Sequence, residues 1–98
     1  MRRNPDYMLK EVADTTVIVP VGQAAVDFPG MITVNETGRQ LWELLAEERG
    51  RSELTAWLCE RFQVEPWKAD ADVEVFLRRL RLAGALLEGA DQAAERGE

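Results

Sequence analysis

Apolar and polar positions alternate along the first part of the chain in the way that β-strands require. Two β-prone runs, Tyr7 to Val12 and Thr16 to Val21, are separated by three residues in which Asp14 favours a tight turn. Valine occupies every other position of the second run, which gives one apolar face and one mixed face. Pro20 cannot donate a backbone hydrogen bond and marks the end of that run. The pattern predicts a β-hairpin whose sheet is covered on one side.

A third strand is expected to begin at Met31. The segment 22–28 before it has no clear period and is predicted to be an extended connection that ends in a turn at Pro29-Gly30. Asn35 follows the strand, and its side chain can accept from the free backbone N–H groups at the start of a helix. We therefore expect the first helix to begin at Asn35 or Thr37.

The remainder of the chain shows helical spacing of apolar residues. Gly50 is placed to end the first helix, Ser52 to cap the second, and Pro66 to lie in the first turn of the third, which stops near Gly84. The apolar positions of the three helices are Leu41, Leu44 and Leu45; Leu54, Leu58 and Phe62; and Val73, Phe76, Leu77 and Leu80. Three strands followed by three helices predict an α+β fold.

The C-terminal region divides into two parts. Leu86 and Leu87 are expected to return the chain onto the core. Residues 89–98 contain no large apolar side chain and are predicted to form a mobile acidic tail, because they cannot offset the entropy of ordering. We expect one domain over residues 1–88, with no internal repeat.

Composition narrows the possible functions. The 98 residues include 18 acidic and 12 basic side chains, for a net charge of −6, which opposes general binding to nucleic acid or to anionic membranes. A chain of this length buries one modest core and has no room for a second domain. The single Cys59 excludes an internal disulfide, and we find no bilayer-spanning run and no secretory signal. The protein is expected to be cytoplasmic.

The search for catalytic residues yields little. The chain has no His, which removes a histidine base and histidine metal ligands. Cys59 lies among expected core residues, which favours a packed and inert thiol. Asp70 and Asp72 project about 200° apart on a helix, so they cannot readily share a metal or a proton. We therefore expect no enzyme activity, no metal site and no cofactor.

Several ordered motifs resemble the PqqD family. They are VIVPVG at 17–22, GMITVNETG at 30–38, LWELL at 41–45, and DVE at 72–74 followed by Phe76, Leu77 and Leu80. The resemblance implies a small winged helix-turn-helix-like domain with a three-stranded antiparallel sheet followed by three helices, and a binding role without catalysis. One departure is Glu65-Pro66-Trp67, where a smaller and more polar helix entry is expected, so the role of Trp67 stays open. Trp42 and Trp57 are expected in or beside the core.

In the family, a leader peptide adds as a further strand to the third strand and lies against the third helix. Such an edge offers unpaired backbone groups to an extended peptide. Ile32 and Val34 are expected to face the core, with Met31 and Thr33 facing away. The candidate peptide-binding residues are Met31, Ile32, Thr33, Val34, Val75, Arg78, Arg79 and Leu82. The alternative is that Val75 and Leu82 only broaden the packed face of the helix and that the arginine stems cover it.

The predicted function is a binding protein, monomeric, that captures the leader region of a ribosomally made precursor peptide for a separate modifying enzyme. The family's partner is often a radical enzyme that uses S-adenosylmethionine, which makes such an enzyme an expected partner. A winged-helix transcription factor is the alternative, because Arg78, Arg79 and Arg81 cluster on one helix, although the acidic balance opposes it. A structural interaction domain within an enzyme complex is a third possibility, and it would not bind an isolated leader.

Overall fold

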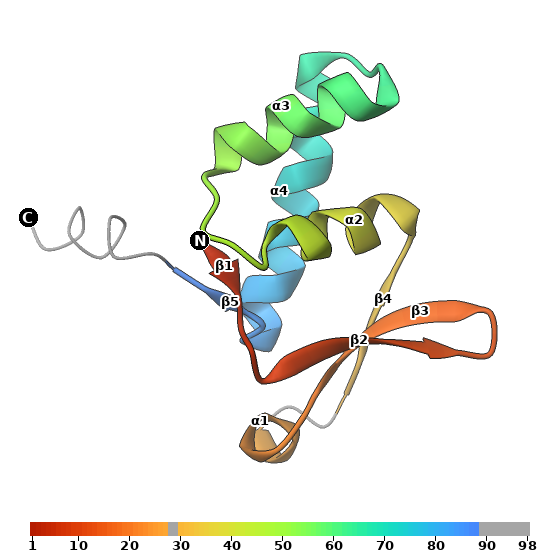
Figure 1. Ribbon diagram of the computed structural model, residues 1–98, viewed down its shortest axis with the longest axis vertical. Helices are drawn as coiled ribbons and strands as arrows, with labels where there is room; N and C mark the ends of the chain where they lie inside the picture. The colour runs from red at the N-terminus through yellow and green to blue at the C-terminus, as the bar shows by residue number, and fades with distance from the viewer. Residues whose placement is uncertain (28–29, 89–98) are drawn as a thin grey trace, which may run out of the picture.

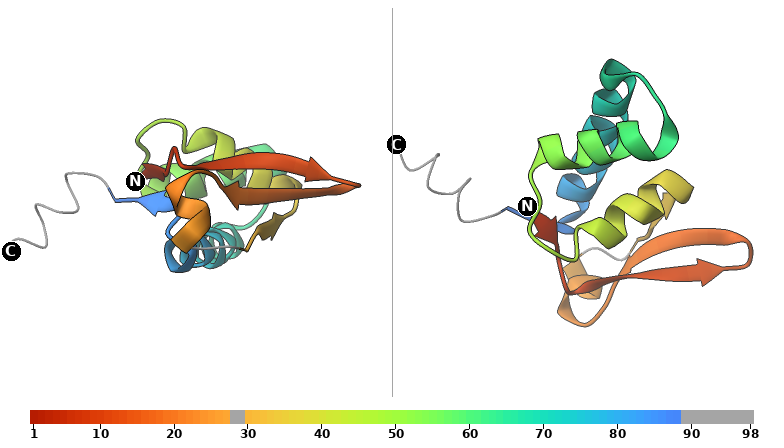
Figure 2. Two further views of the ribbon diagram at one scale, coloured as in Figure 1. Left: turned by 90° about the horizontal axis from the view of Figure 1, so that it is seen from below. Right: turned by 45° about the horizontal axis from the view of Figure 1, so that its top comes forward.

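A three-stranded antiparallel sheet, in the order β2–β3–β4, forms one layer of the structure. The computed structural model describes residues 1–27 and 30–88. Strands β2 (Tyr7–Val12) and β3 (Thr15–Pro20) form the predicted hairpin, in register from Tyr7 opposite Pro20 to Val12 opposite Thr15. The hairpin extends away from the helices (Figures 1 and 2). The predicted tail at 89–98 lies outside the described residues.

The connection from β3 to β4 (Ile32–Val34) differs from the prediction. An extended segment was expected, but Gln23–Asp27 form a short helix, α1. Gly22 adopts a left-handed conformation with φ of 60°, which turns the chain out of β3. The N–H of Ala25 then donates to the carbonyl of Gly22 at 3.1 Å, and the Gln-Ala-Ala sequence favours helix. Residues 28–29 of the expected turn lie outside the described residues.

Three longer helices, α2 (Glu36–Leu44), α3 (Arg51–Phe62) and α4 (Pro66–Ala83), form the second layer (Figure 1). Pro66 opens α4, and Gly84, with φ of 79°, ends it in the left-handed conformation, as predicted. None of the helices in the described ranges is long and apolar enough to cross a membrane.

The boundary between α2 and α3 corrects the prediction. Helix α2 ends at Leu44, before Gly50, because the chain leaves the helix to meet the N-terminus, where the N–H of Arg49 donates to the carbonyl of Met1 at 2.8 Å. Gly50, and not Ser52, is the N-cap of α3, and Glu53 Oε1 accepts from the N–H of Gly50 at 2.8 Å. A tertiary contact thus overrides the local signals.

A second, two-stranded sheet was not predicted. Strand β1 (Arg2–Arg3) pairs antiparallel with β5 (Leu86–Leu87), and Leu86 is buried as expected. The hydroxyl of Tyr7 donates to the carbonyl of Ala83, which fastens the start of β2 to the end of α4. Strands of two residues carry no readable alternation, so a sequence pattern does not reveal them.

The core lies between the three-stranded sheet and the helices. Its largest fully buried members are Trp42, Ile18, Leu41, Leu45, Leu54, Leu58, Leu77 and Leu80, and Tyr7, Ile32 and Phe76 are also buried in it. The expectation of one covered face is wrong at β3, where the neighbours Val17 and Ile18 are both buried. Val17 belongs to the middle strand, and its cross-strand partners Lys10 and Thr33 flank it on the same face.

The three tryptophans and Phe62 have different environments. Trp42 is buried and Trp57 packs against the core, as expected, whereas Trp67 is exposed. Phe62, expected in the core, is partly exposed in the last turn of α3, where its ring meets that of Trp57 edge-on at 6.0 Å.

The first turn of α2 is held by side chains. Asn35 caps the helix as predicted, and its Oδ1 accepts from the N–H of Gly38 at 2.9 Å. Hydrogen bonds to Glu36 lower the pKa of that carboxyl to about 2, and the bond from Arg39 has a larger effect than the bond from Gln40. This anion also lies at the positive end of the helix dipole.

We expect an NMR titration of the Glu36 carboxyl to give a pKa of about 2, below the ordinary 4.5. Because the folded pKa is depressed, the stability that Glu36 contributes is present above pH 4.5 and is lost as the pH falls toward about 2. Arg39→Gln should move the pKa toward its ordinary value, whereas Arg49→Gln, a change away from this carboxyl, should leave it in place. A pKa unaffected by Arg39→Gln would contradict the assignment.

Candidate functional site

Strand β4 has one free edge. It pairs with β3 on one side, with Ile18 opposite Ile32, and no other strand of the described ranges pairs with it. Ile32 and Val34 are each 6% exposed in the core, whereas Met31 is 56% exposed and Thr33 is exposed, so the predicted alternation is confirmed. The outer edge of β4 therefore offers backbone donors and acceptors to an extended segment.

Helix α4 lies beside this edge. The exposed Arg79 reaches from the helix to β4, and its Nη2 donates to the carbonyl oxygen of Thr33 at 2.6 Å. This contact joins residues 46 positions apart in the chain. It fixes which face of α4 is turned toward the strand.

A hollow of about 320 Å³ lies between β4, the first turn of α2 and α4. It is lined by Thr33, Val34, Asn35, Gly38, Phe76 and Arg79. Phe76 and Val34 supply buried apolar surface, while Arg79 supplies a positive charge at the rim. The hollow is suited to an apolar side chain of a segment that runs along the strand edge.

Gly38 allows these elements to approach closely. A Cβ at this position would lie 3.1 Å from the Cβ of Val34 and 3.3 Å from Cε1 of Phe76. These distances are tighter than ordinary contacts, so a side chain here would push α2 away from the strand and α4. Sequence reasoning identified Gly38 within a motif but missed this packing role, and it treated Phe76 only as a core residue.

The structure brings three of the predicted binding residues together, namely Thr33, Val34 and Arg79. Val75 and Leu82 share a face of α4 with Arg79, because they lie four residues before it and three residues after it, and such positions align on a helix. They are 54% and 82% exposed, so they lie off the core stripe.

The remaining predicted residues differ in accessibility. Leu82 also lines a separate hollow with α1 and the start of β2. Met31 precedes β4 and is exposed, whereas the side chain of Ile32 is buried, so only its backbone can meet a ligand. All eight residues remain predictions as binding residues.

Arg78 belongs to an ion-pair cluster on α4. It binds Glu74 at 3.3 Å, and Glu74 also binds Arg51 of α3. Hydrogen bonds from Arg51, the larger effect, and from Arg78 lower the pKa of Glu74. Hydrogen bonds to Asp70 and Glu74 raise the pKa of Arg51. The cluster joins α3 to α4 and neutralises part of the charge of Arg78.

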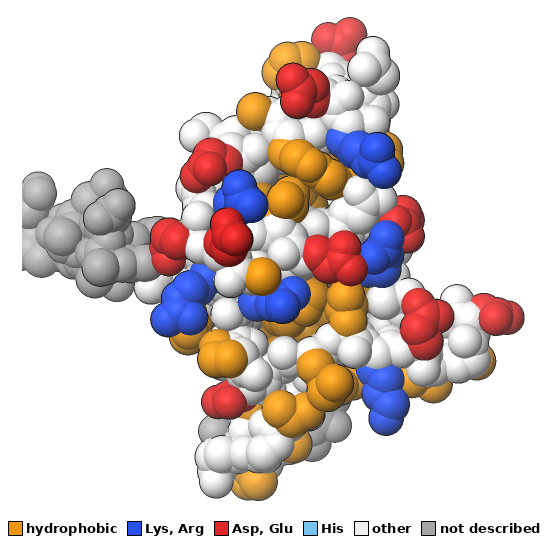
Figure 3. Space-filling view, in the orientation of Figure 1, with side chains coloured by type: hydrophobic (Ala, Val, Ile, Leu, Met, Phe, Trp, Pro, Cys, Tyr) orange, Lys and Arg blue, Asp and Glu red, His pale blue; other side chains and the backbone are white. Residues whose placement is uncertain are grey.

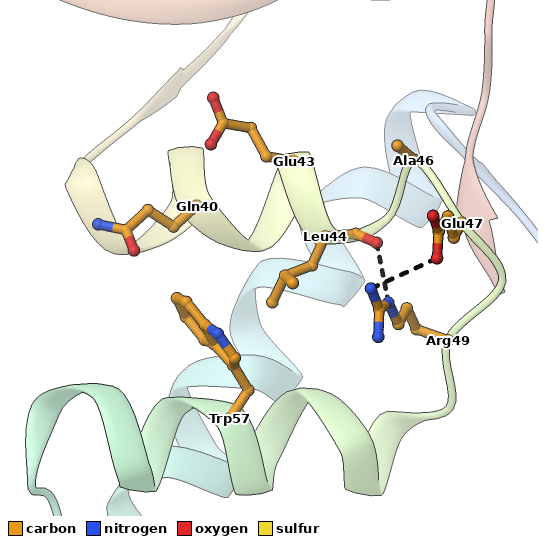
Figure 4. Close-up of a pocket in the computed structure, with 7 residues that line it drawn as sticks. All are labelled: Gln40, Glu43, Leu44, Ala46, Glu47, Arg49 and Trp57. Atoms are coloured by element: carbon orange, nitrogen blue, oxygen red, sulfur yellow. Dashed lines mark hydrogen bonds and ion pairs between the residues drawn. The ribbon is translucent and has the colours of Figure 1, made fainter.

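A second hollow, of about 220 Å³, lies between α2 and α3. In Figure 4 the indole of Trp57 points from α3 toward α2, beside Leu44. Arg49 donates to the carbonyl of Leu44 at 3.1 Å and pairs with Glu47 at 3.6 Å. Hydrophobic side chains are visible on this face of the molecule, with acidic and basic ones around them (Figure 3). This hollow does not include the free strand edge.

The side chains of types that act in catalysis or metal binding in other proteins pack against the core or form ion pairs in this structure. Cys59 is partly buried and packs against the core. Asp70 pairs with Arg51 at 3.1 Å and Asp72 with Lys68 at 3.3 Å, so the two carboxylates serve different partners. Within the described ranges, no three His, Cys, Asp or Glu side chains cluster as metal ligands. The strand edge and its hollow therefore stand out as the candidate site, and their geometry suits binding.

Comparisons with known proteins identify a family and similar folds. Residues 16–86 match the family model described as coenzyme PQQ synthesis protein D (PqqD). No curated protein matches the chain. One similar solved structure is TbiB1 in complex with the TbiA(beta) leader peptide, with a TM-score of 0.70 and 21% identity over 92% of this chain and 99% of that one. Another is lasso peptide synthetase B1 complexed with the leader peptide, with a TM-score of 0.67 and 17% identity over 89% of this chain and 96% of that one.

Proposed function

The chain belongs to the PqqD family, and from this premise we propose that it captures the leader region of a ribosomally synthesised precursor peptide and presents it to a separate modifying enzyme. Two solved structures with the same fold are complexes with leader peptides, which supports this role. The binding domain is assigned to residues 1–88.

The free edge of β4 is the observation that carries the proposal. A leader in extended conformation gains backbone hydrogen bonds at this edge, and its alternate side chains enter the hollow beside Phe76. Val75 and Leu82 provide exposed apolar contacts on α4, and Met31 extends them at the start of the strand. Affinity then comes from the backbone and selectivity from the side-chain pockets.

The chemistry is assigned to the partner. The proposed role is non-catalytic and without a cofactor, and it suits a monomer acting in the cytoplasm. A radical enzyme that uses S-adenosylmethionine is the proposed partner class. The leader bound at β4 and α4 leaves the face between α2 and α3 available for that enzyme.

A DNA-binding role fits the charges less well. Arg78 is paired with Glu74 and Arg81 with Glu88 at 3.0 Å, so two of the three arginines in question already have counter-ions. The net charge of −6 adds long-range repulsion from a duplex.

Titration with two ligands tests the proposal. The neighbouring genes are first searched for a short precursor peptide. We expect the leader of that precursor to bind, with an affinity that changes less than about 10-fold between 50 and 200 mM salt, because only one or two charge pairs form. Duplex DNA from upstream of the gene should not bind measurably. Calorimetry or fluorescence anisotropy gives both results, and steeply salt-dependent DNA binding without leader binding would establish the regulator instead.

A further inference from the structure

Arg79 differs from the other arginines near the end of α4. Arg78 is paired with Glu74 and Arg81 with Glu88. Within the described ranges, no carboxylate forms an ion pair with Arg79, whose hydrogen bond goes to the neutral carbonyl of Thr33 at 2.6 Å. A guanidinium without a counter-ion therefore lies at the free edge of β4.

The carbonyl of Thr33 is an acceptor that an added strand would use. A peptide that pairs with this edge donates its own N–H to the acceptor and competes with Arg79 for it. A guanidinium offers five donors and pairs most strongly with a carboxylate, often through two parallel hydrogen bonds. Strand addition thus releases a cation that needs a new partner at the rim of the hollow.

We propose that Arg79 makes the site selective for leaders that carry an Asp or Glu side chain facing α4. In the free protein its guanidinium covers the Thr33 carbonyl. When the leader strand takes that carbonyl, the guanidinium turns to the leader carboxylate. This inference rests on the proposed function. It pairs one acidic residue of the leader with Arg79 of this chain.

The position of the acidic residue follows from strand geometry. Adjacent residues of a strand project to opposite faces, and α4 packs on the core side of the sheet. The acidic residue therefore occupies one of the alternate leader positions that project toward Phe76 and Arg79. Arg81 is the matched control, because it lies on the same helix and carries the same charge but is paired with Glu88.

A double-mutant cycle tests the assignment. The probe is the synthetic leader of a short precursor peptide found among the neighbouring genes, together with single Asp→Asn and Glu→Gln versions of it. Each peptide is titrated by calorimetry into wild type, Arg79→Gln and Arg81→Gln. We expect one amide substitution to weaken wild-type binding on the order of 10-fold and to change binding to Arg79→Gln by less than about 2-fold. Arg81→Gln should retain the 10-fold loss.

Three results would overturn the inference. They are a leader without an acidic residue, an amide effect of equal size in wild type and Arg79→Gln, and an equal weakening of every peptide by Arg79→Gln together with a lowered melting temperature. The last result would show that Arg79 only joins α4 to β4. Failure of the wild-type protein to bind the leader at all would contradict the proposed function itself.

Discussion

Replacing Leu80 by Ala is expected to lower the free energy of unfolding by about 2–5 kcal/mol. Leu80 is 0% exposed and packs on the core face of α4 with Phe76 and Leu77. Truncation removes buried apolar surface and leaves a cavity that the surrounding helices fill only in part. Because small domains have total stabilities of roughly 5–15 kcal/mol, this loss is a large fraction of the whole. Urea denaturation followed by circular dichroism measures it.

Leu82, two residues further along the same helix, is the matched control. It is 82% exposed, so Leu82→Ala should change the stability by less than about 0.5 kcal/mol. Leu82→Asp and Val75→Asp should likewise leave the fold intact while weakening leader binding, since both side chains lie on the Arg79 face of α4. If either Asp variant destabilises the protein as much as Leu80→Ala, the rotation of α4 is wrong.

Replacing Thr33 by Pro should reduce leader affinity by about 100-fold or more, which corresponds to roughly 2.7 kcal/mol. Proline removes a backbone N–H from the middle residue of β4 and fixes φ, so a peptide loses part of the ladder that would hold it. The Arg79 contact also depends on the position of the Thr33 carbonyl.

Thr33→Ala serves as the control for this change, because it keeps the N–H and removes only an exposed side chain. Its affinity should stay within about 3-fold of wild type, given the modest strand preference of Thr over Ala. Circular dichroism must first establish that Thr33→Pro is folded. A folded Thr33→Pro variant that binds the leader as tightly as wild type would exclude strand addition at β4.

The parts of the fold that the sequence predicts are those with strong local signals. The hairpin of β2 and β3 follows from alternation and a turn, the start of α2 from Asn35, and the bounds of α4 from Pro66 and Gly84. Each signal acts over a few residues, and the structure realises it without competition from distant contacts.

The structure differs from the predictions where contacts between segments that are distant in the sequence determine the fold. Helix α2 ends early because the N–H of Arg49 donates to the carbonyl of Met1. Strand β1 pairs with β5 although almost the whole chain lies between them. At the candidate site, alternation correctly separates Ile32 and Val34 from Thr33. The contact between Arg79 and Thr33 and the close packing around Gly38 depend on how α4 and α2 meet β4, which no local pattern encodes.

The short length of β4 also limits self-association of the protein through its open sheet edge. An open sheet edge invites a second copy of the same chain as readily as it invites a ligand, and long, flat, apolar edges seed fibrils. Three residues, Ile32–Val34, form only a brief ladder, and the guanidinium of Arg79 already occupies the middle acceptor. An edge of this kind discourages sheet-to-sheet aggregation while leaving room for a guest that brings further contacts along α4.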